Sequence, residues 1–270
     1  MRIVSLSSIP PRFGQLGPVL ESLLAQRPRV DAVQLHVPRR YRRFPDYDGT
    51  PPSVPDGVTL VRPDEDLGPA SKVLFAARAL RGTDTQILFC DDDKLFSPDW
   101  AVRLFDEQAA RPDMCVALAG KHLPKDIERT GPRTPRAVLG GGFDPAYEAG
   151  KLLWRTGLNP GPRPTRRVVR EAGFADILQG LGGVVVRPDF FDDEAFDIPD
   201  ILWAVDDVWL SGMLERRGIP IWLPAGLRRP APLPGGDGNS LYEAVIDGVK
   251  RDDANRRCIE HLRERYGIWR

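Results

Sequence analysis

Three consecutive aspartates follow a short apolar segment in the first half of the chain. Residues 86–90 read QILFC, and Asp91, Asp92 and Asp93 come directly after them. If this run is a buried strand, alternation of side chains puts Asp91 and Asp93 on one face and Asp92 on the other. Two neighbouring carboxylates repel each other unless a cation compensates, and Mg²⁺ or Mn²⁺ is typically held by one or two carboxylates plus substrate phosphates. The pattern favours a divalent cation site over a solvated turn that caps the next helix, because Ser97 already offers a cap there.

A second acidic pair, Asp206 and Asp207, stands at the start of an expected helix over residues 205–217. Acidic side chains at a helix start satisfy free backbone amides and the helix dipole, which accounts for the pair without any chemistry. Near a metal-binding strand end, however, such a carboxylate is a candidate general base. From the sequence alone both interpretations stay open.

The segment from Asp64 to Lys72, which follows the expected strand at 58–61, is expected to form a loop-to-helix junction of a kind that can bind phosphate. Gly68 permits a tight turn, the helix start offers free amides, and Lys72 lies one turn in, where its ammonium could reach a phosphate. The spacing is not that of a P-loop. An ordinary junction with a surface lysine remains the alternative.

Two further segments are less specific. The glycine-rich segment 179–183 (QGLGG, with Gly180, Gly182 and Gly183) precedes an expected strand over 184–186. Glycines there would let a ligand or another backbone approach closely, although a plain turn or a bulge would use the same residues. Arginines within 39–43 could contact an anionic acceptor or form a solvated loop.

The segments that must position these residues alternate between strand-like and helix-like patterns. Short apolar runs predict strands at 3–6, 32–37, 58–61, 86–90, 116–119, 184–186 and 219–223. Helical spacing and start signals predict helices at 16–24, 69–80, 97–110 (with Ser97 as N-cap and Pro98 after it), 205–217 and from about 241 or 251 to 266. This alternation implies an α/β fold with a mainly parallel central sheet, helices on both faces and ligands at the carboxyl ends of the strands. Residues 121–173 are polar and poorly periodic, so no element is assigned to them.

The amino-acid composition argues against several classes of protein. The 270 residues carry 38 Lys plus Arg against 38 Asp plus Glu, and this balance argues against a dedicated nucleic-acid binder. The three cysteines lack C-x-x-C spacing, which argues against a disulfide scaffold or a cysteine zinc site and favours a cytoplasmic location. No apolar run is long enough for a transmembrane segment, which leaves peripheral contact with a membrane open.

Taken together, these residues resemble glycosyltransferases of the GT-A fold and are most similar to bacterial family-2-like enzymes. The resemblance covers most of the chain and rests on VSLSSIPPR at 4–12, GPASK at 68–72, the D-x-D motif at 91–93, GGV at 182–184, DDVWLS at 206–211 and NRRC at 255–258.

The resemblance implies a nucleotide-sugar donor, in particular a UDP-sugar, whose diphosphate Mn²⁺ or Mg²⁺ bridges to the D-x-D motif. Asp93 matches the last acid of that motif and would ligate the metal directly, and Asp91 would lie near the metal or the ribose. Asp207 matches the family's catalytic base, while Asp206 stands where Glu is common, so the choice between these two acids stays open. The residues expected to bind the donor are Ser7, Pro11, Arg12, Asp66, Lys72, Asp91, Asp92, Gly182 and Gly183.

The reaction that the resemblance implies is transfer of the sugar, with inversion, to a hydroxyl of a glycan, glycolipid or other acceptor in cell-surface glycan synthesis. The expected organisation is one GT-A domain over 1–270. It comprises a nucleotide-binding half (1–120), an acceptor-binding half (121–240) with a lid at 225–240, and a C-terminal helix (241–270).

Two alternatives remain. A sugar nucleotidyltransferase would share the sheet, the metal and the diphosphate, but such enzymes usually carry a glycine-rich basic loop after the first strand, which residues 7–12 lack. A noncatalytic carbohydrate-binding module could use a carboxylate-bound Ca²⁺, although the aspartate triplet lacks the spacing of an EF-hand.

Overall fold

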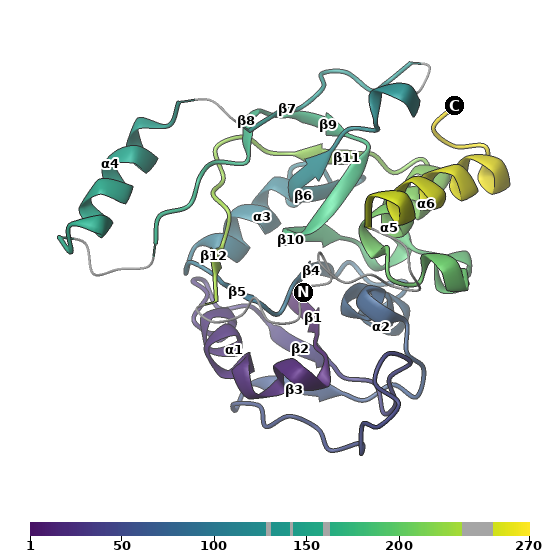
Figure 1. Ribbon diagram of the computed structural model, residues 1–270, viewed down its shortest axis with the longest axis horizontal. Coiled ribbons are helices and arrows are strands. Elements are labelled where there is room, and N and C mark those ends of the chain that lie inside the picture. Colours follow the sequence, from purple (N-terminus) through teal and green to yellow (C-terminus); the bar gives the residue numbers. More distant parts are fainter. Residues whose placement is uncertain (128–130, 141–142, 159–162, 234–250) are drawn as a thin grey trace.

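An eight-stranded sheet forms the centre of the protein in a computed structural model, which describes residues 1–270 apart from 128–130, 141–142, 159–162 and 234–250 (Figure 1). The strand order is β3-β2-β1-β4-β10-β6-β11-β9. In chain order the bounds are β1 (Arg2–Ser7), β2 (Ala32–His36), β3 (Val58–Val61), β4 (Gln86–Cys90), β6 (Cys115–Lys121), β9 (Gly173–Ala175), β10 (Ile177–Val186) and β11 (Ile221–Leu223). Only β10 and β9 run antiparallel to their neighbours, so the fold is mixed α/β with a mainly parallel sheet, as predicted.

Helices cover both faces of this sheet. They are α1 (Leu16–Leu24), α2 (Ser71–Ala79), α3 (Trp100–Ala109), α4 (Pro145–Arg155), α5 (Asp206–Arg216) and α6 (Arg251–Tyr266). Figure 1 shows α1 and α3 on one side of the sheet and α2, α5 and α6 on the other. The two-sided cover explains why every residue of β4 is buried, since alternate side chains of a strand point to opposite faces.

The start of α3 differs from the sequence-based expectation. The helix begins at Trp100 rather than at Ser97, and Asp99 occupies the N-cap position without a side-chain cap. The Ser97 hydroxyl donates to Asp99 Oδ1 (2.7 Å), while the Ser97 carbonyl accepts from the Trp100 amide (3.0 Å). A local side-chain bond thus replaces the expected cap and delays the helix by a few residues.

The strand expected at 184–186 is longer than its apolar run. It forms part of β10, which begins at Ile177 and includes the glycine segment 180–183. The pairing of β10 with β6 shifts register between Gln179 and Val184. Glycines therefore mark a bulge inside the strand rather than a turn before it.

The segment that the sequence left unassigned contains short elements at the edge of the fold. They are β7 (Val138–Leu139), β8 (Val169–Glu171), the 3-10 helix Lys125–Ile127, and α4. Asp144 caps α4 by accepting from the Tyr147 amide (3.0 Å). A separate short ladder joins β5 (Lys94–Leu95) to β12 (Ala231–Pro232). For the final helix, the start at Arg251 agrees with the later of the two expected starts, and residues 241–250 lie outside the described part of the chain.

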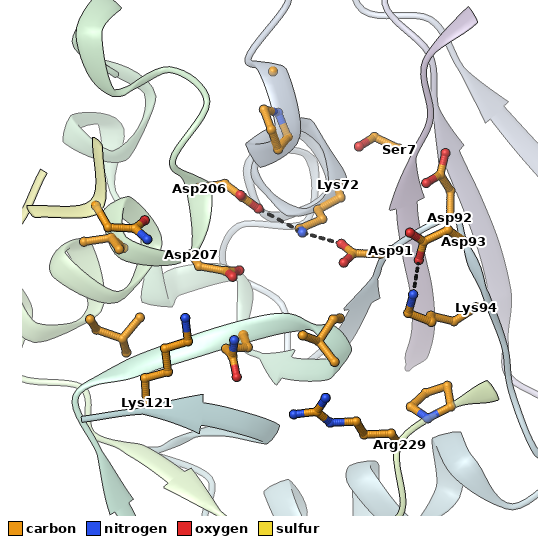
Figure 2. A pocket seen from close by; sticks show the side chains of 18 of the residues that line it. Ser7, Lys72, Asp91, Asp92, Asp93, Lys94, Lys121, Asp206, Asp207 and Arg229 are labelled. Atoms are coloured by element: carbon orange, nitrogen blue, oxygen red, sulfur yellow. Dashed lines mark hydrogen bonds and ion pairs between the residues drawn. The ribbon is translucent and has the colours of Figure 1, made fainter. Parts of the chain in front are cut away.

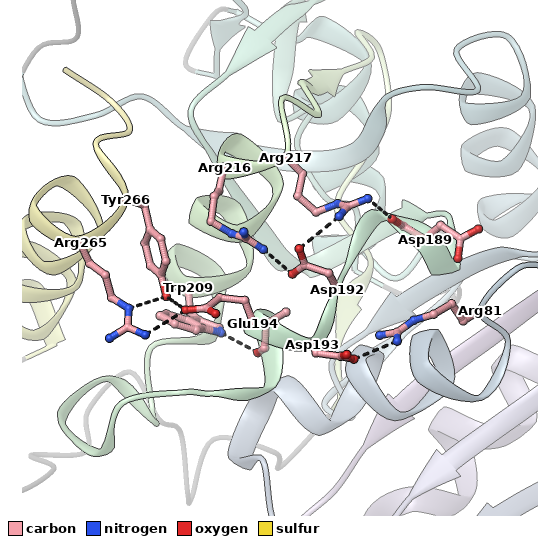
Figure 3. A network of polar contacts seen from close by, with 11 residues as sticks. Arg81, Asp189, Asp192, Asp193, Glu194, Trp209, Arg216, Arg217, Arg265 and Tyr266 are labelled. Atoms are coloured by element: carbon pink, nitrogen blue, oxygen red, sulfur yellow. Dashed lines mark hydrogen bonds and ion pairs between the residues drawn. The ribbon is translucent and has the colours of Figure 1, made fainter.

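A polar network fixes α5 and α6 against the segment that precedes them (Figure 3). Trp209 in α5 donates through Nε1 to the Ala195 carbonyl (2.9 Å), which fastens the middle of the helix. The remaining contacts are Arg216 and Arg217 with Asp192, Arg81 with Asp193, and Arg265 and Tyr266 with Glu194. With α5 so placed, Asp206 pairs with Lys72 of α2 and Asp207 accepts from the Gly180 amide of β10.

The bulge in β10 predicts a selective effect on stability. Gly183 has φ +102°, and a Cβ there would approach Trp100 Cζ2 to 2.5 Å, whereas Gly82 has φ +76° with open space around it. We expect Gly183→Ala to lower the free energy of unfolding by about 2–4 kcal/mol, from backbone strain plus overpacking, and Gly82→Ala by about 1 kcal/mol, from strain alone. Urea denaturation measures both, and equal losses would show that contact with Trp100 is unimportant.

Candidate functional site

A cavity of about 1240 Å³ opens where β1 and β4 end. Because these two strands are parallel neighbours, their carboxyl ends meet at the same edge of the sheet. The cavity brings together the predicted residues Ser7, Arg12, Asp66, Lys72, Asp91, Asp92, Asp93, Asp206 and Asp207. The position agrees with the expectation for an open α/β sheet.

Lys72 lies at the centre of the charged residues. Its Nζ is 2.7 Å from Asp91 Oδ1 and 2.8 Å from Asp206 Oδ2 (Figure 2). The side chain is buried, so it is not a surface lysine. Burial favours the neutral amine, but the charges of Asp206 and Asp91 outweigh it and hold the pKa of Lys72 well above its usual value. Lys72 therefore provides a permanent positive charge on the cavity wall.

Gly180 makes room for this ammonium group. A Cβ on Gly180 would lie 2.5 Å from Lys72 Nζ, and the Gly180 amide donates to Asp207 Oδ1 (2.9 Å). Gly180 is therefore the glycine of this segment that the charged cluster requires.

Gly182 and Gly183, which the sequence assigned to donor binding, do not line the cavity. A Cβ on Gly182 would lie 2.8 Å from Leu118 Cδ2, and the Gly182 carbonyl accepts from Trp100 Nε1 (2.8 Å). Both glycines thus accommodate packing by β6 and α3, because the bulge turns this part of β10 away from the cavity. Pro11 also lies outside the cavity lining, exposed on the 3-10 helix Pro10–Gln15.

Asp207 titrates well above the usual range of an aspartate. Burial, and then the negative charge of Asp206, raise the pKa of Asp207 to about 7, although Lys72 acts in the opposite direction. Asp206 instead forms the ion pair with Lys72. A carboxyl group that titrates near neutral pH is suited to accept a proton from a hydroxyl and later release it.

The aspartate triplet divides into one buried and two partly exposed carboxylates. Asp92 is buried and accepts from the Ser8 hydroxyl and from Arg12 Nη1. Asp91 and Asp93 remain partly exposed, and Asp93 Oδ1 lies 2.8 Å from Lys94 Nζ. Asp92 thus anchors the segment after β1, while its two neighbours keep carboxylate surface in the cavity.

The donor set suits a divalent cation only in part. Among the residues that the structure describes, no group of three or more His, Cys, Asp or Glu side chains is placed to hold a metal ion. Asp91 and Asp93 both line the cavity, where their carboxylates pair with Lys72 and Lys94, and oxygen ligands of this kind suit Mg²⁺ or Mn²⁺ when a bound ligand adds its own oxygens. The residues therefore fit a cation that arrives with a phosphate-bearing ligand.

Asp66 and Gly68 fix the conformation of the loop that forms one wall of the cavity. The Asp66 carboxylate accepts from the amides of Arg42 (2.8 Å) and Gly68 (2.9 Å). Gly68 has φ +58°, and a Cβ there would lie 2.7 Å from the indole of Trp203. The tight turn predicted at Gly68 is present, and it lets Trp203 lie against the loop.

A basic wall, which the sequence did not identify, also lines the cavity. Its cationic and imidazole side chains are Lys121, His122, Arg163, Arg166, Arg167 and Arg229. Most of them come from the unassigned region, where no periodic pattern showed which way a side chain points. The density of arginines at 163–170 was the one available signal.

The segment expected to form a lid is described only over 225–233. Arg229, Pro230 and Pro232 line the cavity, and the Leu233 amide donates to the Asp93 carbonyl (3.0 Å). Residues 234–240 of that segment lie outside the described part of the chain.

Comparisons with known proteins give weak likenesses. No protein-family model matches the chain, and no curated protein matches its sequence. One similar solved structure is GalNAc-T7 with UDP, GalNAc and Mn²⁺, at 12% identity and TM-score 0.49, covering 99% of this chain and 49% of that one. The chain thus spans about half the length of that protein. Another is 2-C-methyl-D-erythritol 4-phosphate cytidylyltransferase (IspD) of Francisella tularensis, at 14% identity and TM-score 0.40, covering 95% and 96%. At these scores and identities neither likeness indicates an activity for this chain.

The central ion pairs predict a pH-dependent stability defect. In Lys72→Met the carboxylates of Asp91, Asp206 and Asp207 lose their shared cation, so we expect the free energy of unfolding to fall by about 3–5 kcal/mol at neutral pH. Without the ammonium the pKa values of these acids rise, and stability linked to a raised folded-state pKa is recovered as pH falls. Urea denaturation at neutral and mildly acidic pH tests this. The exposed Lys125→Met is the control, and a defect that does not shrink on acidification would contradict the assignment.

Proposed function

We propose that this protein is a GT-A glycosyltransferase that moves a sugar from a nucleotide-sugar donor, in particular a UDP-sugar, to an acceptor hydroxyl. The observation that carries the proposal is the cluster of Lys72 with Asp91 and Asp206, beside an Asp207 carboxyl that titrates near neutral pH. The cluster supplies positive charge, carboxylates for a cation and a base in one cavity.

Donor binding is assigned to the wall formed by the ends of β1 and β4. Asp91 and Asp93 would hold Mn²⁺ or Mg²⁺, which when bound offsets the negative charge that develops on a departing diphosphate. Lys72 adds a fixed positive charge to the same wall, because its pKa lies well above neutral. Ser7, Arg12 and Asp66 line the cavity close by and are proposed to orient the nucleotide.

Asp207 is the proposed base, and Asp206 supports it. The ion pair with Lys72 offsets the charge of Asp206, while the amide of Gly180 orients the carboxylate of Asp207. In the reaction the acceptor oxygen bonds to the anomeric carbon, the bond from that carbon to the diphosphate oxygen breaks, and Asp207 takes the hydroxyl proton. A single displacement of this kind inverts the anomeric centre.

Acceptor binding is assigned to the basic wall. Lys121, His122 and Arg229 line it. Such a wall suits a glycan or glycolipid acceptor that carries negative charge, consistent with a role in cell-surface glycan synthesis at the cytoplasmic side of a membrane.

The first test is slow hydrolysis of the donor. With Mn²⁺ and a panel of nucleotide-sugars, we expect the protein to release nucleoside diphosphate from one donor class. Asp93→Ala should reduce that release by at least about tenfold, because a carboxylate that holds the cation is lost. Release is followed with a coupled nucleoside diphosphate assay.

The control is Asp64→Ala, since Asp64 is exposed and lies outside the cavity lining. Turnover of a nucleoside triphosphate with a sugar phosphate would instead identify a nucleotidyltransferase. Failure to turn over either substrate class, with Ca²⁺-dependent glycan binding in its place, would identify a binding module.

The second test is the pH dependence of the reaction. A base with a pKa of about 7 should make kcat/KM rise with pH up to about neutral and then level off, because only the ionised Asp207 accepts a proton. Asp206→Asn removes a negative charge that helps to raise this pKa, so the midpoint should move to lower pH.

Initial rates of diphosphate release across a pH series measure both midpoints. Asp64→Asn should leave the midpoint in place, and Asp207→Asn should remove the dependence altogether. An upward shift in Asp206→Asn would rule out the assignment of Asp207 as base.

A further inference from the structure

Exposed apolar side chains gather on and beside α4. Five of the six large hydrophobic side chains that are exposed in the described part of the chain lie within residues 143–158. They are Phe143, Leu152, Leu153, Trp154 and Leu158, with exposed fractions from 39% for Trp154 to 85% for Phe143. Such a concentration is unlike the scattered single residues of an ordinary surface.

The helix is attached to the protein on the side that carries Tyr147, Gly150 and Trp154. Tyr147 is buried, the Arg166 guanidinium lies 4.7 Å from its ring centroid, and Arg166 also pairs with Glu148 (3.0 Å). Gly150 lies against Pro164, where an added Cβ would come within 3.3 Å. Figure 1 shows α4 standing apart from the sheet and from the other helices. Leu152 and Leu153 are therefore left exposed although the helix itself is anchored.

Positive charge surrounds this apolar surface. The described residues of 143–171 include six cationic and three acidic side chains, a local excess of three in a chain with zero net charge. The cations are Lys151, Arg155, Arg163, Arg166, Arg167 and Arg170, and the acids are Asp144, Glu148 and Glu171. Each acid already pairs with an arginine. The charge around α4 thus complements an anionic surface.

We propose that α4 binds the surface of an anionic lipid bilayer, with Leu152 and Leu153 inserted at the boundary between headgroups and acyl chains. An amphipathic helix with apolar side chains on one side and Lys or Arg beside them lies in this interface. Anionic headgroups attract the neighbouring cations. No helix in the described part of the chain is both long and apolar enough to cross a bilayer, so the contact is peripheral.

The proposed surface is continuous with the cavity. Arg163 and Arg166 contact the aromatic rings of α4 and also line the basic wall. A bilayer bound by α4 would therefore lie beside the end of the cavity that contains this wall. The inference goes beyond the proposed transfer reaction and does not depend on it, since binding to lipid requires neither donor nor metal.

Co-sedimentation with vesicles tests the proposal on the whole chain. We expect binding to vesicles of equimolar phosphatidylcholine and phosphatidylglycerol, and much weaker binding to phosphatidylcholine alone. Leu152→Ser combined with Leu153→Ser should weaken binding by roughly tenfold or more, because the apolar contact is lost. Circular dichroism checks that this variant is folded, and neither leucine lines the cavity.

A charge-matched pair of variants tests the electrostatic part. Lys151→Glu with Arg155→Glu should weaken binding to the anionic vesicles, whereas Arg39→Glu with Arg40→Glu, two exposed arginines after β2, should not. The proposal is overturned if the native chain does not sediment with the anionic vesicles, if both charge variants behave alike, or if neutral vesicles bind equally well. Self-association that the leucine variant abolishes, without vesicle binding, would identify a second copy as the partner instead.

Discussion

The ion pairs of Lys72 with Asp91 and Asp206 are the interaction on which the rest of the site depends. They join the end of β4 to α2 and to the start of α5, three segments far apart in the chain. Burying these groups costs solvation free energy, and each becomes tolerable only because the others are present. The sheet, the glycine at position 180 and the polar network around α5 all serve to bring these charges together.

The same constraint gives neighbouring acids different chemistry. Lys72 pairs with Asp206, while burial and the charge of Asp206 raise the pKa of Asp207. In the triplet after β4, Asp92 is used to hold Arg12 and Ser8, whereas Asp91 and Asp93 face the cavity. The pair thus contains one residue committed to charge balance and one suited to a reaction, and the triplet contains one structural residue and two suited to a reaction. Such division by environment is how carboxylates acquire separate roles.

The two walls of the cavity come from different parts of the fold. One wall contains Asp91, Asp92 and Asp93 and is formed by strand ends of the central sheet. These strand ends are rigid because helices cover both faces of the sheet. The basic wall is formed by irregular segments that also hold α4, where apolar and cationic side chains are exposed together. Although the chain has no net charge, its cavity therefore has an acidic and a basic wall, and the segment around α4 carries excess positive charge. The proposed transfer reaction and the proposed binding to lipid both depend on this uneven distribution of charge.

Apolar runs, helix start signals and the positions of the acidic motifs were sufficient to predict the mainly parallel sheet, most of its strands, and a cavity at the carboxyl ends of β1 and β4. These features follow from local patterns, because burial of a strand and the alternation of its side chains are visible in a few consecutive residues. Only the tertiary structure decided that Lys72 is buried between two acids, that Gly180 rather than Gly182 adjoins the charges, and that Ser97 does not begin α3. It also decided that residues 145–155 form a helix with an exposed apolar surface. Those outcomes depend on contacts between distant segments and on a bulge in β10, neither of which is encoded in the spacing of nearby residues.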